Sequence, residues 1–159
     1  MENQTWNPKT ADLDAPLHAL GFVIDELSPH KVTGHLPVTP KCCQGFGVLH
    51  GGLSAMIAEG LASIGAHIAS GYHRIAGIQL SSNHMKPAEL GDLVYAEATP
   101  INLGKSIQVW EVRVWKNDPS NSREKIVVSC SRVTIKCNIP MPESVKASSE
   151  KLRKYIAKL

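Results

Sequence analysis

The sequence predicts an α+β domain in which an antiparallel sheet wraps one long helix and a C-terminal helix follows. Residues 42–73 form an apolar or neutral run with a helical period and one formal charge, Glu59. After Arg74 the period changes to two, and long segments alternate apolar and polar residues. The turns between these segments suit antiparallel pairing. A lone apolar helix needs a sheet to cover it, so the two parts are expected to pack together.

Composition narrows the class of protein. The 159 residues fit one domain, and the net charge of +3 comes from scattered basic residues that make no nucleic-acid footprint. No apolar run approaches the roughly 18 residues of a membrane span without a polar break. The four cysteines lack the spacing of a metal site, so we expect free thiols and no metal. We divide the chain into a flexible N-terminus (1–14), the domain (15–140) and a basic C-terminal helix (141–159).

Each element between the termini is assigned from its period and its turn residues. We expect a short helical turn at 17–20, a Gly-containing loop at 41–50 and a helix that starts at Pro142. An irregular alternation near Gln108 and Val109 is compatible with a bulge. The expected strands cover residues 21–27, 31–38, 74–86, 93–100, 105–116 and 125–137.

The long helix, expected over residues 53–70, has no charged face. One stripe is apolar and the opposite side carries alanines, a pattern typical of a helix that is buried all round. Glu59 and Ser63 lie one turn apart and share a face. A buried carboxylate needs either an ion pair with Arg or Lys of the sheet or a chemical role, and both interpretations stay open here. The stripe consists of Leu53, Met56, Ile57, Gly60, Leu61, Ile64 and Ile68, and the alanines are Ala55, Ala58, Ala62 and Ala66.

Gly51 and Gly52 open this helix, so their N–H groups lack intrahelical partners. Without side chains, they let a ligand carbonyl approach closely, and the positive end of the helix dipole favours a developing oxyanion. Glu59 lies two turns further, roughly 12 Å along the axis. One carbonyl therefore cannot contact both groups of the same helix.

Residues 47–63, GVLHGGLSAMIAEGLAS, resemble the HGG-x6-E segment of the hotdog-fold acyl-CoA thioesterases. The spacing from His50 to Glu59 is similar to that of their 4-hydroxybenzoyl-CoA and 1,4-dihydroxy-2-naphthoyl-CoA branch, and Gln44 and Ser63 match two further positions. SSNHMKP, with His84, and NLGK, at 102–105, resemble two other family segments. The likeness covers residues 15–140 and is greatest with the peroxisomal dihydroxynaphthoyl-CoA thioesterases of phylloquinone synthesis.

This resemblance implies a hotdog fold and a set of catalytic residues. Glu59 would attack the thioester carbon or activate a water molecule, and the Gly51 N–H would bind the oxyanion. Gln44 would hydrogen-bond near the thioester, and Ser63 would orient Glu59. His50 would brace the loop before the helix. A serine bonded to its own helix and a histidine satisfied in the core remain the structural alternatives.

The resemblance also implies the substrate contacts and the assembly. His84 and Gly52 would line the thioester end, and Lys86 and Lys105 would hold the phosphates of coenzyme A unless they are ordinary surface lysines. Coenzyme A is part of the substrate, so no separate cofactor is expected. The charge-poor helix back and an exposed sheet edge indicate association with another copy. The resemblance implies a dimer with shared sites that pairs into a tetramer.

The last three residues, Ala157-Lys158-Leu159, resemble the tripeptide that the peroxisomal import receptor reads, so we expect peroxisomal localisation. The expected activity is hydrolysis of an aryl-CoA, with dihydroxynaphthoyl-CoA as the best candidate. A broader acyl-CoA thioesterase, a hotdog dehydratase and a non-catalytic acyl-CoA-binding protein are the alternatives. The HGG-x6-E spacing speaks against the dehydratase, and a lone carboxylate in an apolar helix speaks against the binder.

Overall fold

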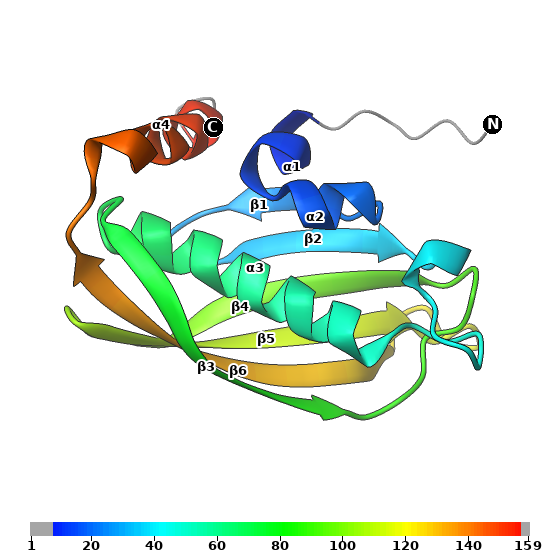
Figure 1. Cartoon of the computed structure of the whole chain (residues 1–159). Helices are drawn as coiled ribbons and strands as arrows, with labels where there is room; N and C mark the ends of the chain where they lie inside the picture. Colours follow the sequence, from blue (N-terminus) through cyan, green and yellow to red (C-terminus); the bar gives the residue numbers. More distant parts are fainter. Residues whose placement is uncertain (1–7, 157–159) are drawn as a thin grey trace.

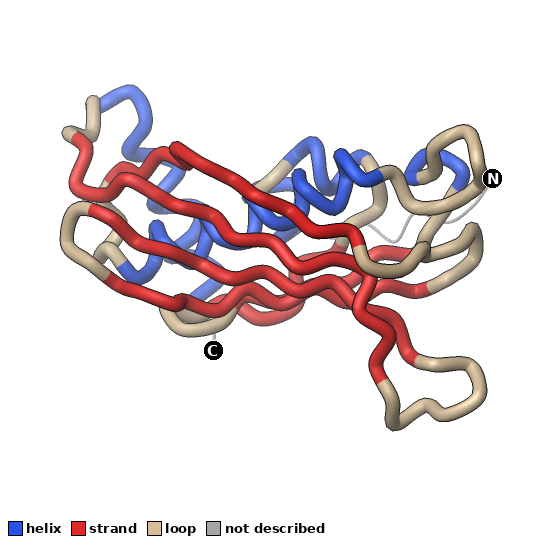
Figure 2. The backbone as a smooth tube through the Cα atoms, turned by 90° about the horizontal axis from the view of Figure 1, so that it is seen from below, coloured by secondary structure: helices blue, strands red, loops and turns tan. Residues whose placement is uncertain are grey.

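A six-stranded antiparallel sheet curves around the long helix α3 (Gly51–Ala69) in the computed structural model, which describes residues 8–156 (Figure 1). This arrangement confirms the predicted α+β class. Figure 2, viewed from below, shows the strands in front of the helices, so the sheet has one face that the helices cover. In order across the sheet, the strands are β1 (Val23–Leu27), β2 (Val32–Pro37), β4 (Leu93–Leu103), β5 (Ile107–Asn117), β6 (Lys125–Ile139) and β3 (Arg74–His84).

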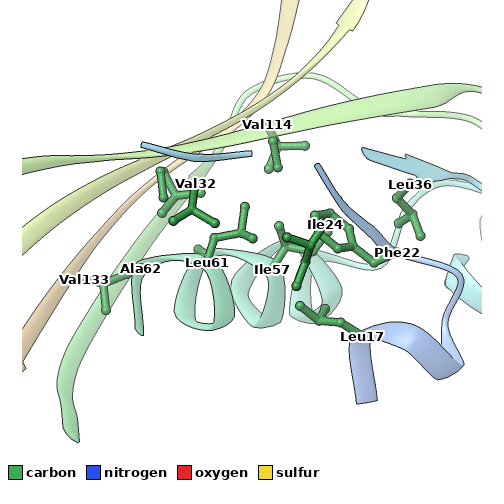
Figure 3. Packing of buried hydrophobic residues seen from close by; sticks show 14 of the residues in the cluster. Leu17, Phe22, Ile24, Val32, Leu36, Ile57, Leu61, Ala62, Val114 and Val133 are labelled. Atoms are coloured by element: carbon green, nitrogen blue, oxygen red, sulfur yellow. The ribbon is translucent and has the colours of Figure 1, made fainter. Parts of the chain in front are cut away.

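The core lies between α3 and the concave face of the sheet (Figure 3). Ile57 and Leu61 of α3 are fully buried against strand residues such as Val114 and Val133. Beside them, the helix passes so close to the sheet that a Cβ atom at Gly65 would lie 2.5 Å from the indole of Trp110. Close packing of this kind is possible only because the helix carries small residues where it meets the large ring.

One prediction for α3 was wrong. The helix is not buried all round, although Ala58, Ala62 and Ala66 are fully buried as expected. The outer face instead carries Met56, which is 41% exposed, and Glu59, which is also exposed. Small side chains pack closest to the sheet, and this rotates the Glu59 side toward solvent in the single chain.

The N-terminal segment is more ordered than the flexible 1–14 that we expected. Helix α1 (Pro8–Leu13) is fixed by Thr10, which is fully buried and accepts a hydrogen bond from the Ile24 N–H at 2.9 Å. Helix α2 (Ala15–Ala19) follows at the predicted helical turn, and Asp14 caps it. Residues 1–7 lie outside the described part of the chain. The turn η1 (Pro40–Cys42) then leads from β2 toward the start of α3.

The irregularity expected near Gln108 and Val109 is not a bulge in β5. Gln108 points inward, is 2% exposed, and accepts a hydrogen bond from the Trp110 Nε1–H at 2.9 Å, so the alternation of β5 is unbroken. The extra residue lies on the neighbouring strand, because the register shifts between Pro100 and Asn102 of β4. The sequence pattern was irregular only because polar Gln108 occupies an inward position of β5.

The chain ends in the turn η2 (Glu143–Val145) and helix α4 (Lys146–Ile156). The C-terminal tripeptide lies outside the described residues. Within residues 8–156, α3 is the one helix that is long and apolar enough, by length and composition, to cross a membrane, which sequence inspection had not predicted. Its most apolar window is 56% buried inside the domain, as in a packed core helix.

Candidate active site

The first two amide N–H groups of α3 differ in whether they are free to donate a hydrogen bond to a ligand. His50 caps the helix, and its Nδ1 accepts the Gly52 N–H at 2.9 Å. For the Gly51 N–H, no acceptor exists among residues 8–156. The ring of His84 covers this glycine, since a Cβ atom there would lie 3.1 Å from His84 Nε2. Gly51 therefore offers a free donor next to an imidazole, whereas the Gly52 amide is already bonded.

A cavity of about 350 Å³ opens at this point, and we call it the Gly51 cavity. It brings together Gln44, Gly51, His84 and Lys86, which the sequence analysis had selected separately. Ser54, buried on the first turn of α3, also lines it and was missed, because a single serine in a helix carries no distinctive pattern. Val48, Leu49, Met85, Pro87, Ala88 and Val128 complete the lining.

Glu59 is positioned two turns further along α3, outside this cavity. Its Oε1 accepts a hydrogen bond from Ser63 Oγ at 3.0 Å, as their spacing predicts. The same oxygen lies 2.6 Å from where a Cβ atom of Gly77 would be, so the glycine lets the carboxylate approach β3. No lysine or arginine among residues 8–156 forms an ion pair with Glu59, so the ion pair with the sheet that was the structural alternative is absent there.

A second carboxylate near Glu59 was not selected from the sequence. Asp14 Oδ2 lies 2.9 Å from where a Cβ atom of Gly60 would be, and Asp14 Oδ1 accepts the Leu17 N–H at 3.0 Å. Burial raises the pKa of the Asp14 carboxyl, the Leu17 hydrogen bond opposes this, and the negative charge of Glu59 raises the pKa further. The Asp-Ala-Pro sequence of a helix cap explains Asp14 locally but does not reveal its neighbour.

The two candidate phosphate-binding lysines lie at opposite ends of the sheet. Lys86 lines the Gly51 cavity, beyond the His84 end of β3. The Lys105 carbonyl accepts a hydrogen bond from the side chain of Asn138, next to the residue that pairs with Arg74 at the other end of β3. Ten residues of strand separate these ends by roughly 33 Å. Within one chain, the two lysines cannot contact the same phosphate.

Comparisons with known proteins agree with this geometry. Residues 46–122 match the Thioesterase superfamily. Over 156 residues the chain is 55% identical to 1,4-dihydroxy-2-naphthoyl-CoA thioesterase 2 of Arabidopsis thaliana, covering 96% of this chain and 99% of that protein. The chain belongs to the thioesterase superfamily. A 1,4-dihydroxy-2-naphthoyl-CoA hydrolase of Listeria monocytogenes is 38% identical over 117 residues, 73% of this chain and 89% of that protein.

Solved structures of related proteins have the same fold as this chain. A solved thioesterase from Haemophilus influenzae superposes with a TM-score of 0.71 at 29% identity, covering 86% of this chain and 92% of its own. These relatives establish the hotdog fold for this thioesterase. The family segment 46–122 contains Gly51, Glu59 and His84 but leaves out Gln44 and the whole of α4. Strands β1, β2 and β6 of the sheet also lie outside this segment.

The contact between Glu59 and Gly77 generates a prediction. Replacement Gly77→Ala places a methyl group 2.6 Å from the carboxylate oxygen, closer than van der Waals contact allows, so Glu59 must move. Because small displacements of a reacting group are costly, we expect kcat for an acyl-CoA substrate to fall about tenfold or more. A thermal melt within a few degrees of wild type would exclude general unfolding. An unchanged kcat in the folded variant would show that the observed Glu59 position is not needed.

Proposed function

We propose that this thioesterase hydrolyses an aryl-CoA, with 1,4-dihydroxy-2-naphthoyl-CoA as the preferred substrate, to the free acid and coenzyme A in phylloquinone formation. The observation that carries the proposal is the Glu59 carboxylate, which is held by Ser63 on the outer face of α3 and has no cationic partner among residues 8–156. The near full-length identity of 55% to the Arabidopsis protein of that name supports the choice of acyl group.

Two groups of the chain would carry out the reaction. The thioester oxygen accepts the Gly51 N–H, which has the dipole of α3 behind it and stabilises the oxyanion by roughly 3 kcal/mol in a dry site. Ionised Glu59 either attacks the carbonyl carbon, expelling the thiolate and leaving an anhydride that water cleaves, or deprotonates a water that attacks directly. Either route consumes one water and yields acid, thiol and no modified enzyme. Coenzyme A belongs to the substrate, and neither route uses a resident cofactor or metal.

The distance along α3 implies that two subunits complete each site. β3 is an edge strand of 11 residues whose outer row is unpaired in the single chain, and its Ile78 is 56% exposed. Such an edge favours strand pairing with a second copy, and exposed Met56 extends the apolar surface onto α3. Antiparallel pairing would bring the His84 end of one β3 toward the Gly77 side of its partner. Glu59 of one subunit would then face the Gly51 cavity of the other, and two such dimers would form the tetramer.

The catalytic role predicts the behaviour of Glu59→Ala. We expect a folded protein whose thioester hydrolysis is lower by at least about a hundredfold, the usual scale for an acid–base or nucleophilic group. Free thiol release should be measured across aryl, short and long acyl-CoAs, because this panel also separates an aryl-CoA enzyme from a broader one. Glu124→Ala, at an exposed turn, is the matched control and should retain full activity. Turnover near the wild-type rate in Glu59→Ala would refute the mechanism.

The shared site predicts complementation between two inactive variants. A mixed dimer of one Glu59→Ala and one Gln44→Ala subunit, isolated with two different affinity tags, has one site with both residues intact and one with neither. We expect about half of wild-type activity, whereas each variant alone remains inactive. If the site lay within one chain, every site of the mixed dimer would lack one residue. The mixed dimer would then be inactive.

We also propose that the protein acts in the peroxisome. The support is the sequence Ala157-Lys158-Leu159, a small-basic-leucine ending of the type that the import receptor binds. A fluorescent protein fused to the N-terminus should enter peroxisomes with the full chain and remain diffuse when the three residues are deleted. Peroxisomal fluorescence of the shortened protein would refute the role of this tripeptide.

A further inference from the structure

A second cavity, of about 330 Å³, lies at the carboxyl end of α3, and we call it the α4 cavity. Figure 1 shows α4 next to this end of α3 and the start of β3. The lining is largely apolar, with Ile64, Ile75 and Leu152 from three different elements. Its volume is within the range of small-molecule sites, which begins at about 300 Å³.

Helix α4 forms a fixed wall of this cavity. Leu152 is 3% exposed, and buried Ser149 bonds His67 Nε2 at 3.0 Å. The His67 Nδ1–H donates to the His73 carbonyl at 2.7 Å, and burial lowers the pKa of this ring, which agrees with a neutral imidazole that accepts from Ser149. The Tyr155 hydroxyl also donates to Asp12 of α1. The wall is therefore held to both α3 and α1.

The α4 cavity is adjacent to the proposed nucleophile. Ser63 lines it, and the same hydroxyl donates to Glu59 at 3.0 Å. A thioester carbon that contacts Glu59 is thus one side chain away from the cavity mouth. The Gly51 cavity lies at the other end of α3, so the α4 cavity is free to take the part of the substrate on the acyl side of the carbonyl.

Two cations lie around this apolar cavity. Arg74 at the start of β3 and Lys151 of α4 both line it, and neither forms an ion pair within residues 8–156. Asp12, the carboxylate of the lining, is bonded to Tyr155. An apolar space with free N–H donors at its margin suits a flat aromatic group that bears oxygen substituents.

We propose that the α4 cavity binds the aromatic rings of the acyl group, that Arg74 and Lys151 bind ring hydroxyl groups, and that α4 thereby determines acyl specificity. The inference rests on the proposed thioester hydrolysis at Glu59 and adds the place and chemistry of acyl recognition. It assigns a substrate-binding role to a helix that lies outside the superfamily segment 46–122.

Two substitutions in α4 test it. Ser148 lines the cavity but is exposed, so Ser148→Trp fills the space without disturbing the core. The expected result is that the ratio of kcat/KM for 2-naphthoyl-CoA over benzoyl-CoA falls about tenfold or more. Lys151→Met should lower kcat/KM severalfold for hydroxynaphthoyl-CoA and leave that for unsubstituted naphthoyl-CoA unchanged. Matched controls are Ala147→Trp and Lys154→Met, which lie on the same helix and do not line the cavity.

The outcomes separate this inference from the proposed function. Ratios equal to wild type in Ser148→Trp, or equal losses for hydroxylated and unsubstituted substrates in Lys151→Met, overturn acyl binding at α4. Acyl binding at α4 is also overturned if Ala147→Trp lowers the ratio of kcat/KM for 2-naphthoyl-CoA over benzoyl-CoA as much as Ser148→Trp does. Ratios are unaffected by a partly unfolded fraction, and Lys151→Met is a surface change that leaves the fold intact. If Glu59→Ala stays active, the proposed mechanism fails whatever these ratios are.

Discussion

The contact between α3 and the sheet is the constraint on which the site depends. Gly65 packs against Trp110, and the alanines at 58, 62 and 66 are fully buried. These small residues must face the sheet, which fixes the orientation of the helix about its own axis. That orientation directs Glu59 and Ser63 away from the core, onto a face where Glu59 lies beside Gly77 of β3 and is exposed among residues 8–156. The position of the carboxylate therefore follows from the packing of residues that have no chemical role.

The same packing explains which parts could be predicted from the sequence. Strand and helix identities follow from periods of two and 3.6, and the structure confirms them. Burial was harder to predict because composition indicated a helix buried all round, whereas Met56 and Glu59 of α3 are exposed. Glu59 was assigned correctly to the helix face of Ser63 but wrongly to the interior, since composition does not reveal the direction of that face. The opposite case is Gln108, a polar residue that points into the core because its side chain accepts a hydrogen bond from Trp110.

The candidate site was predictable where its residues belong to segments that resemble the family. Gln44, Gly51 and His84 meet at one cavity, in agreement with their selection by motif. Asp14 and the lining from α4 were missed because they reach the site only through tertiary contacts, whereas Ser54 was missed because a single helix serine carries no pattern. Lys105 matched a family segment, yet it lies at the far end of the sheet. A motif specifies which residue types occur, whereas the distance between them depends on the completed sheet.

The two cavities lie at opposite ends of α3, and the proposed reaction would use both. Its amino end presents a hydrogen-bond donor and its carboxyl end borders a ring-sized apolar space, with the carboxylate between them. A single chain holds these groups too far apart for one thioester, but the proposed antiparallel pair would place the donor end of one helix opposite the acyl end of the other. In that arrangement the thioester would lie at Glu59, coenzyme A would extend toward the partner's donor end, and the acyl rings would enter the α4 cavity. In the proposed dimer, the separation that requires two chains for each site would also keep the two halves of the substrate apart.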